Sequence, residues 1–274
     1  MPARPTASNP RTDSAEPFPV PGAGDLLDDP FGRSLRLVVG NARQAFRWIR
    51  PGCFQMGSPA DETQRGVAEL PHEVTISHGF WLADTACTQA FWTAVWPVNP
   101  SHFQEDPRHP VENVAWHDTQ RFLAELNRRL PGLNARLPYE AEWEYACRAG
   151  TTTPFSFGNQ ITTEQVNYHG DFPYADGMKG VYRQRPVPVA SLPPNPWGLY
   201  EMHGNVWEWC ADWYADYPGE PQVDPRGPTF GKMRVLRGGT WSDPARYARS
   251  ATRSRIEPVY RPRSTGFRLV IAQS

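Results

Sequence analysis

Acids, aromatic rings and a cysteine gather in one short stretch of this chain, GNVWEWCADWY at residues 204–214. Such a cluster fits a catalytic centre, a metal site or a packed core. Glutamates at 140, 142 and 144 raise the same question, because paired carboxylates act as general acid and base. Acids on one helix are more often solvated or paired with arginines, and we take that structural interpretation here. For His203, next to the cluster, we expect a hydrogen bond that completes the structure.

Generic catalytic motifs do not accompany these residues. The sequence has no G-x-S-x-G, no H-E-x-x-H, no Walker loop and no dinucleotide fingerprint. The four cysteines form no C-x-x-C pair, so the spacing of a zinc ribbon or redox motif is absent; they are Cys53, Cys87, Cys147 and Cys210. With no signal peptide and no membrane-spanning apolar run, we expect reduced, mostly buried thiols in a cytoplasmic protein without a membrane partner.

The composition limits the fold that can position these groups. The 274 residues include 30 prolines and 11 tryptophans, and 39% are hydrophobic. Proline at this density excludes a helical bundle, and 12% aromatic residues exclude a disordered chain. A net charge of -1 carries no electrostatic sign of nucleic-acid binding. The sequence therefore predicts a folded, loop-rich domain with no nucleic-acid partner.

Regular elements are predicted mainly in the first half of the chain. Residues 1–33 are rich in turn formers and are predicted to be a flexible leader, with strands beginning near SLRLVV at 34–39. FWLADTACTQAFWTAVWP predicts a strand followed by a helix, with Thr88 as its N-cap. WHDTQRFLAELNRRLPG predicts the clearest helix, started by Asp118, with an apolar face at Phe122, Leu123, Leu126 and Leu130.

Another helix is predicted in PYEAEWEYACRAG, residues 138–150, which begins with proline and acids and closes with arginine and glycine. From residue 151 onward, the runs TTTPFSFGNQ, DFPYADGMKG and SLPPNPWGLY indicate turns and loops held by aromatic residues and prolines. The second half is therefore predicted to be mostly irregular.

Six segments in a fixed order carry a resemblance to a known family: RWIRPGCFQMGS, TACTQAFWTAVWPVNPSHF, RLPYEAEWEYACRAG, PNPWGLYEMHGNVWEWCADWY, RVLRGGTW and TGFRLV. Together they resemble the formylglycine-generating enzyme, or sulfatase-modifying factor, family over about residues 45–272. The resemblance implies an α+β fold, a variant of the C-type lectin fold with little regular structure, a small antiparallel sheet and a few helices. It also implies one domain over residues 34–274.

The same resemblance implies a structural calcium ion at the opening cluster. Its ligands would be the backbone carbonyls of Gly204 and Val206 and the carboxylate of Glu208, with Glu201 at a place where relatives often have asparagine. Hard oxygen ligands of this kind suit calcium.

This sequence departs from the family at the residues that carry its redox chemistry. Formylglycine-generating enzymes oxidise a substrate cysteine at a copper(I) ion that two cysteine thiolates hold, and such a soft ion needs thiolates. Anchored on GGTW and TGFRLV, those two positions fall on Asp243 and Ala248. We therefore expect no copper and favour a protein that is not an enzyme. The alternative is an oxidoreductase of the same superfamily that acts without the two cysteines, with Asp243, His203 and Tyr247 as its first candidates.

The C-terminal segment, residues 234–274, also resembles the variable region of proteins diversified by diversity-generating retroelements. Ten candidate ligand-binding positions lie where relatives often have asparagine: Ser242, Asp243, Tyr247, Thr252, Ser254, Ile256, Val259, Tyr260, Pro262 and Ser264. Arginines alternate with them, and relatives pair many of these arginines internally. Aromatic and small polar residues together suit protein recognition. The leading hypothesis is a non-catalytic binder of a protein ligand, and an invariant surface loop fits the pattern equally well.

Overall fold

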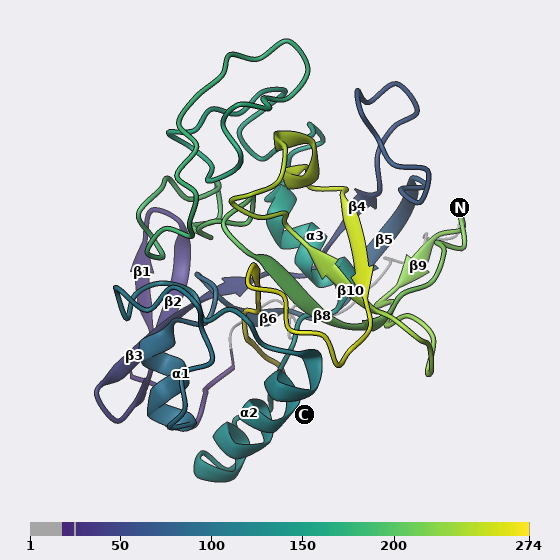
Figure 1. The fold of residues 1–274 in the computed structure, drawn as a ribbon. Helices are drawn as coiled ribbons and strands as arrows, with labels where there is room; N and C mark the ends of the chain where they lie inside the picture. Colours follow the sequence, from purple (N-terminus) through teal and green to yellow (C-terminus); the bar gives the residue numbers. More distant parts are fainter. Residues whose placement is uncertain (1–17, 25, 274) are drawn as a thin grey trace, which may run out of the picture.

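The computed structural model describes residues 18–24 and 26–273. Three sheets and three α-helices make up its regular part (Figure 1). The six-stranded sheet has the order β1 (Leu27–Asp29), β2 (Gly32–Val39), β3 (Ala42–Ile49), β6 (Phe80–Ala83), β13 (Val270–Ile271) and β7 (Ala135–Arg136). The four-stranded sheet has the order β11 (Arg253–Ile256), β10 (Arg234–Arg237), β8 (Trp207–Trp213) and β12 (Thr265–Gly266). The three-stranded sheet has the order β4 (Gly52–Met56), β5 (His72–Ile76) and β9 (Gln222–Val223).

Strand β2 shows the alternation that its sequence predicts. Leu35, Leu37 and Val39 are buried, and the strand pairs with β3 in an antiparallel register. The domain begins earlier than residue 34, however. Strand β1 pairs with β2, and Val20 is buried. Of the predicted leader, residues 1–17 lie outside the described residues.

The predicted helices are confirmed. Helix α1 (Gln89–Val95) begins at Thr88, whose hydroxyl accepts a hydrogen bond from the Phe91 amide at 3.1 Å. Helix α2 (Trp116–Arg129) buries its apolar face, and Asp118 accepts from the Ala115 amide at 2.9 Å. Helix α3 (Glu140–Arg148) ends where Ala149 adopts a left-handed conformation. None of the helices in the described residues is long and apolar enough to span a bilayer.

The second half of the chain is mostly irregular, as predicted. Between α3 and β8, residues 151–206 carry only turns and isolated bridges, and they form the loops at the top of Figure 1. Phe155, Tyr168 and Tyr174 form a small core beneath these loops with Ala245 and Ala248. Strands resume at β8 but are short, so the prediction of a mostly irregular second half is confirmed. The pairing of β8, β10 and β11 was not predicted, because it joins residues far apart in the chain and no local periodicity indicates it.

The four-stranded sheet positions the C-terminal segment. Strand β10 lies between β8 and β11, and α3 packs behind them at the centre of the molecule (Figure 1). A short 3₁₀ helix (η2, Ala245–Ala248) follows β10, and β12 then returns parallel to β8. The opening cluster of the sequence is thus a central strand, with Trp209 and Cys210 fully buried.

Candidate ligand-binding site

Buried arginine–carboxylate pairs fix the C-terminal segment to the rest of the domain. Arg253 donates to both oxygens of Glu140 at 2.7 and 2.8 Å, and Arg268 donates to both oxygens of Glu208 at 2.6 and 2.7 Å. Arg249 pairs with Glu69 and with Glu62 on the loop between β4 and β5. Bidentate pairs of this kind set orientation as well as energy. The prediction of internal pairing is confirmed for these arginines.

The three acids of α3 belong to the same network. Glu140, Glu142 and Glu144 are all buried, and their partners are Arg253, Arg136 and the pair Arg148 and Arg237. Burial alone would raise the pKa of Glu140, but Arg253 and Arg237 hold that pKa below its usual value. These carboxylates are structural counter-ions, as the sequence interpretation proposed.

The predicted calcium ligands lie in two different polar environments. Glu208 accepts from Arg268 and from the Trp143 indole at 2.7 Å, so its charge is already compensated. Glu201 accepts from the amides of Ala190 and Leu192 at 3.0 and 3.4 Å, and burial raises its pKa to about 7. Among the described residues no three His, Cys, Asp or Glu side chains gather as a metal site.

The backbone carbonyl ligands of that predicted calcium site belong to Gly204 and Val206, and both residues are buried. Gly204 has a φ of +74°, and its amide donates to the Gly238 carbonyl at 2.7 Å. A calcium ion at Glu208 would have to compete with a guanidinium for the same carboxylate, so this donor set fits calcium poorly. The calcium assignment stays a prediction.

The positions of the family's copper ligands face different surroundings here. Asp243 is half-buried, and burial raises its pKa. Ala248 is buried, and its carbonyl accepts from the Nδ1–H of His203 at 2.6 Å. A carboxylate and a methyl group offer no thiolate at either position.

No pair of sulfurs replaces the missing thiolates in a solvent-reachable cleft. Cys87, Cys147 and Cys210 are fully buried, and all four cysteines are free. The Cys147 sulfur lies 3.7 Å from the Nε2 of His203, yet burial raises the pKa of Cys147 to about 12 and lowers that of His203 to about 4. This buried pair is therefore a neutral thiol beside a neutral imidazole, not a nucleophile and its base.

His203 has no free nitrogen for catalysis. Its Nδ1–H donates to Ala248, while its Nε2 accepts from the amide and hydroxyl of Ser156 at 3.1 and 2.9 Å. Tyr247, another candidate of the enzyme alternative, lies at the surface, where Arg246 donates to its hydroxyl at 3.2 Å. His203 therefore has the structural hydrogen-bonding role that the sequence predicted.

The ten candidate ligand-binding residues divide by exposure. Tyr247, Val259 and Tyr260 are 37, 59 and 55% exposed. Six are half-buried: Ser242, Asp243, Ser254, Ile256, Pro262 and Ser264. Thr252 is only 4% exposed, and its hydroxyl donates to the Arg246 carbonyl at 3.0 Å. The assignment of Thr252 to a binding surface was wrong, because this side chain closes the turn that carries Arg246.

The structure joins part of this set to residues that the sequence interpretation missed. Trp241 contacts the ring of Phe103 at 5.7 Å and lies 6.2 Å from Tyr182, which stacks on His169 at 3.6 Å. We call these four residues the aromatic cluster. The His169 amide donates to the Asp243 carbonyl at 2.9 Å, so Ser242 and Asp243 adjoin the cluster.

Exposed apolar side chains extend the surface beside the aromatic cluster. Phe172, Met178 and Val181 are exposed on the loop that also carries Tyr182, and the Phe172 carbonyl accepts from the Ala245 amide at 3.0 Å. The only signal in the sequence was the run DFPYADGMKGVY, in which apolar residues interrupt a turn-rich loop. Contiguous exposed apolar residues of this kind mark binding surfaces.

Ser254 lies in a groove away from the aromatic cluster. The groove has a volume of about 610 Å³, runs between residues 66–69 and β11, and is lined by Tyr214, Ser254 and Arg255. The Arg255 guanidinium lies 4.3 Å from the Tyr214 ring centre. The ten candidates therefore do not form one patch, because β11 faces this groove whereas Ser242 and Asp243 adjoin the aromatic cluster.

Comparison with known proteins places these features in context. The model of the sulfatase-modifying factor enzyme 1-like domain matches residues 38–273. A formylglycine-generating enzyme of Bos taurus is 36% identical over 175 residues, which cover 59% of this chain and 44% of the relative. The chain spans about half the length of the curated relatives it matches.

Two solved structures resemble the whole fold. Treponema denticola variable protein 1 has a TM-score of 0.74 at 28% identity and covers 87% of this chain and 98% of its own. PvdO from Pseudomonas aeruginosa has a TM-score of 0.71 at 27% identity and covers 93% of this chain and 99% of its own. The predicted α+β fold, a C-type lectin-like variant, is confirmed.

Proposed function

Because the chain belongs to the sulfatase-modifying factor family, we propose that it is a non-catalytic member that binds a protein ligand through its C-terminal segment. The observation that carries the proposal is the pair of residues at the copper-ligand positions. Asp243 and Ala248 cannot supply thiolates for copper(I), while Arg249, Arg253 and Arg268 of the same segment pair with buried glutamates. The proposal therefore rests on a segment that keeps its structural anchors and lacks the family's two copper-binding cysteines.

The exposed residues of the segment favour a protein as the ligand. Tyr247, Val259 and Tyr260 are exposed, and Arg246, which makes no ion pair among the described residues, donates to the Tyr247 hydroxyl at 3.2 Å. Tyrosine and arginine are the residues that most often dominate binding energy at protein interfaces. The apolar loop at Phe172 would enlarge the contact next to the aromatic cluster.

Likeness to a variable protein supports diversification of this segment by a retroelement. At 28% identity, Treponema denticola variable protein 1 shares the fold over nearly all of its length. In this proposal the arginines that pair with buried glutamates stay fixed while the residues between them vary. Thr252 falls outside the variable set on structural grounds.

The first test concerns the gene and its neighbourhood. Diversification requires a nearby reverse-transcriptase gene and an adenine-rich near-copy of the codons for residues 234–274. Both should be present, with mismatches at the codons of the exposed positions and none at those of Arg249, Arg253 and Arg268. If neither is present, the diversified form of the proposal fails, and the simple binding form remains to be tested with surface variants.

An enzyme without the two cysteines is the second candidate, and 36% identity to a formylglycine-generating enzyme favours it. Its three candidate residues do not fit a shared site, since His203 is enclosed and Tyr247 is exposed. Oxygen consumption by the purified protein, measured with copper or iron supplied and with a cysteine-containing peptide, separates the two functions. Turnover would support the enzyme and overturn the binding protein.

A further inference from the structure

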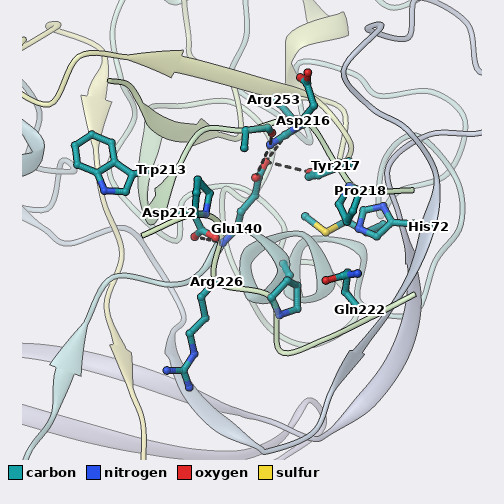
Figure 2. A pocket seen from close by; sticks show the side chains of 16 residues that line it. His72, Glu140, Asp212, Trp213, Asp216, Tyr217, Pro218, Gln222, Arg226 and Arg253 are labelled. Atoms are coloured by element: carbon teal, nitrogen blue, oxygen red, sulfur yellow. Dashed lines mark hydrogen bonds and ion pairs between the residues drawn. The ribbon is translucent and has the colours of Figure 1, made fainter. Parts of the chain in front are cut away.

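A cavity of about 290 Å³ lies beneath the loop that joins β8 to β10 (Figure 2). Its wall combines the start of α3, His72 of β5, Asp212 of β8 and the covering loop. Met56 and three prolines supply apolar surface, namely Pro218, Pro225 and Pro228. The volume is at the lower end of the range for small-molecule sites, so it suits a ligand of few atoms.

Asp212 is the unusual group in this wall. It is 5% exposed, and its Oδ2 accepts from the Glu140 amide at 2.7 Å. The neighbouring acids Glu140 and Glu142 each pair with an arginine, whereas Asp212 pairs with none within the described part of the chain. Burial, then repulsion from Glu140, raises the pKa of Asp212 to about 8. A buried carboxylate without a counter-ion is costly, and a cation supplied by a ligand would relieve that cost.

The protein's own cations nearby are engaged elsewhere. Arg253 donates to Glu140, and Arg234 lies between the rings of Trp116 and Trp213 at 3.7 and 3.5 Å. Figure 2 shows the guanidinium of Arg226 extending away from Asp212, and it lies 5.3 Å from the Tyr139 ring. Arg136 of β7 also lies close enough to interact with Asp212, but it pairs with Glu142 at 2.7 Å. The other charged and titratable groups around Asp212 are Glu140 and Glu142 of α3, Arg234 of β10, Arg253 of β11, His72 of β5, and Arg226, Asp216 and Tyr217 of the covering loop.

His72 offers a second acceptor on the cavity wall. Its Nδ1 lies 3.0 Å from the Leu70 carbonyl, which places the proton on Nδ1 and leaves Nε2 with a free lone pair. His72 and Asp212 both line the cavity, and Figure 2 shows them on opposite sides of Glu140. The cavity wall therefore combines two hydrogen-bond acceptors, Asp212 and His72, with the apolar surface of prolines. Such a wall suits a ligand that carries several N–H donors on a hydrocarbon group.

We propose that this cavity binds the ammonium group of a small organic amine, with Asp212 as its counter-ion and His72 as a further acceptor. The prolines and Met56 would pack against the hydrocarbon part of the ligand. The site is independent of the C-terminal surface, so it stands whether or not that surface binds a protein.

Three probes of one size test the charge preference: benzylamine, benzyl alcohol and benzoate. Titration calorimetry at neutral pH should show the amine binding at least about tenfold more tightly than the alcohol, because charge-assisted hydrogen bonds are the stronger class. Benzoate should not bind. Equal affinity for amine and alcohol, stronger binding of benzoate, or no binding of the amine would overturn the proposal.

Variants locate the site. Asp212→Asn keeps an acceptor for the Glu140 amide and should remove the preference for the amine. The control Glu73→Gln, an exposed acid on β5 outside the cavity lining, should keep it. Binding that Asp212→Asn leaves unchanged would contradict the proposal. If that variant fails to fold, the wild-type protein can be tested alone. Calorimetry at pH 7 in two buffers of different ionisation enthalpy should show that Asp212 releases about one proton for each amine bound. Zero release would count against Asp212 as the counter-ion.

Discussion

Two sets of arginines in one segment behave in opposite ways. Arg249, Arg253 and Arg268 are directed inward and pair with glutamates from distant parts of the chain, whereas Arg246 and Arg255 lie at the surface with their guanidinium groups over tyrosine rings. Arg253 and Arg255 are two residues apart on β11, so their side chains leave the same face of the strand, and both lie over the Tyr214 ring. Arg253 is the buried one because it reaches Glu140 at the start of α3, whereas Arg255 lies farther along the strand and is exposed. The comparison teaches that a single segment can anchor the domain and display a surface at the same time.

Replacing the inward arginine of β11 should have the largest effect. Arg253→Met leaves the buried Glu140 without its bidentate partner, and breaking such a pair costs about 3–5 kcal/mol. Urea unfolding at pH 7 would measure the loss.

The matched control for that change is Arg255→Met on the same strand. It removes only an exposed contact with Tyr214, so a loss of about 0.5–1 kcal/mol is expected. Equal losses for the two variants would abolish the distinction between anchor and surface.

Asp212 should respond to pH in the opposite sense to Glu140, whose pKa is held below its usual value by Arg253 and Arg237. The pKa of Asp212 is raised from 3.8 to about 8 in the folded state, so the unfolded chain gives up this proton more readily. Its stabilising contribution is complete below pH 4 and is lost as the pH rises through 8.

Unfolding of wild type and Asp212→Asn between pH 5 and pH 9 isolates that contribution. The difference in unfolding free energy, wild type minus variant, should fall by a few kcal/mol over this range, on the order expected for a buried carboxyl. A difference that rises with pH would show that Asp212 has a cationic partner after all.

Much of the frame could be predicted from the sequence, whereas much of the surface could not. Caps and apolar periodicity define α1 and α2 locally, so Thr88 and Phe122 were assigned correctly. The aromatic cluster depends instead on contacts between Phe103, Tyr182 and Trp241, which are far apart in the chain. No short-range pattern reports such contacts, nor that the loop after β8 would enclose Asp212.

Thr252 tests the boundary between frame and surface. Thr252→Val keeps the shape of the side chain but removes its hydrogen bond to the Arg246 carbonyl, which should cost about 1 kcal/mol. Thermal unfolding would measure the change. An unaffected melting temperature would return Thr252 to the set of replaceable positions.

The smallest effect on stability is expected for the residues that the proposed function needs most. Tyr247→Ser, Val259→Ser and Tyr260→Ser, combined, alter only exposed side chains and should change the unfolding free energy by about 0.5 kcal/mol or less per site. The same triple variant should lose affinity for a ligand selected from a peptide display library against the wild-type protein. A large loss of stability would mean that these side chains support the domain, because a surface that varies freely requires a frame that is stable without it.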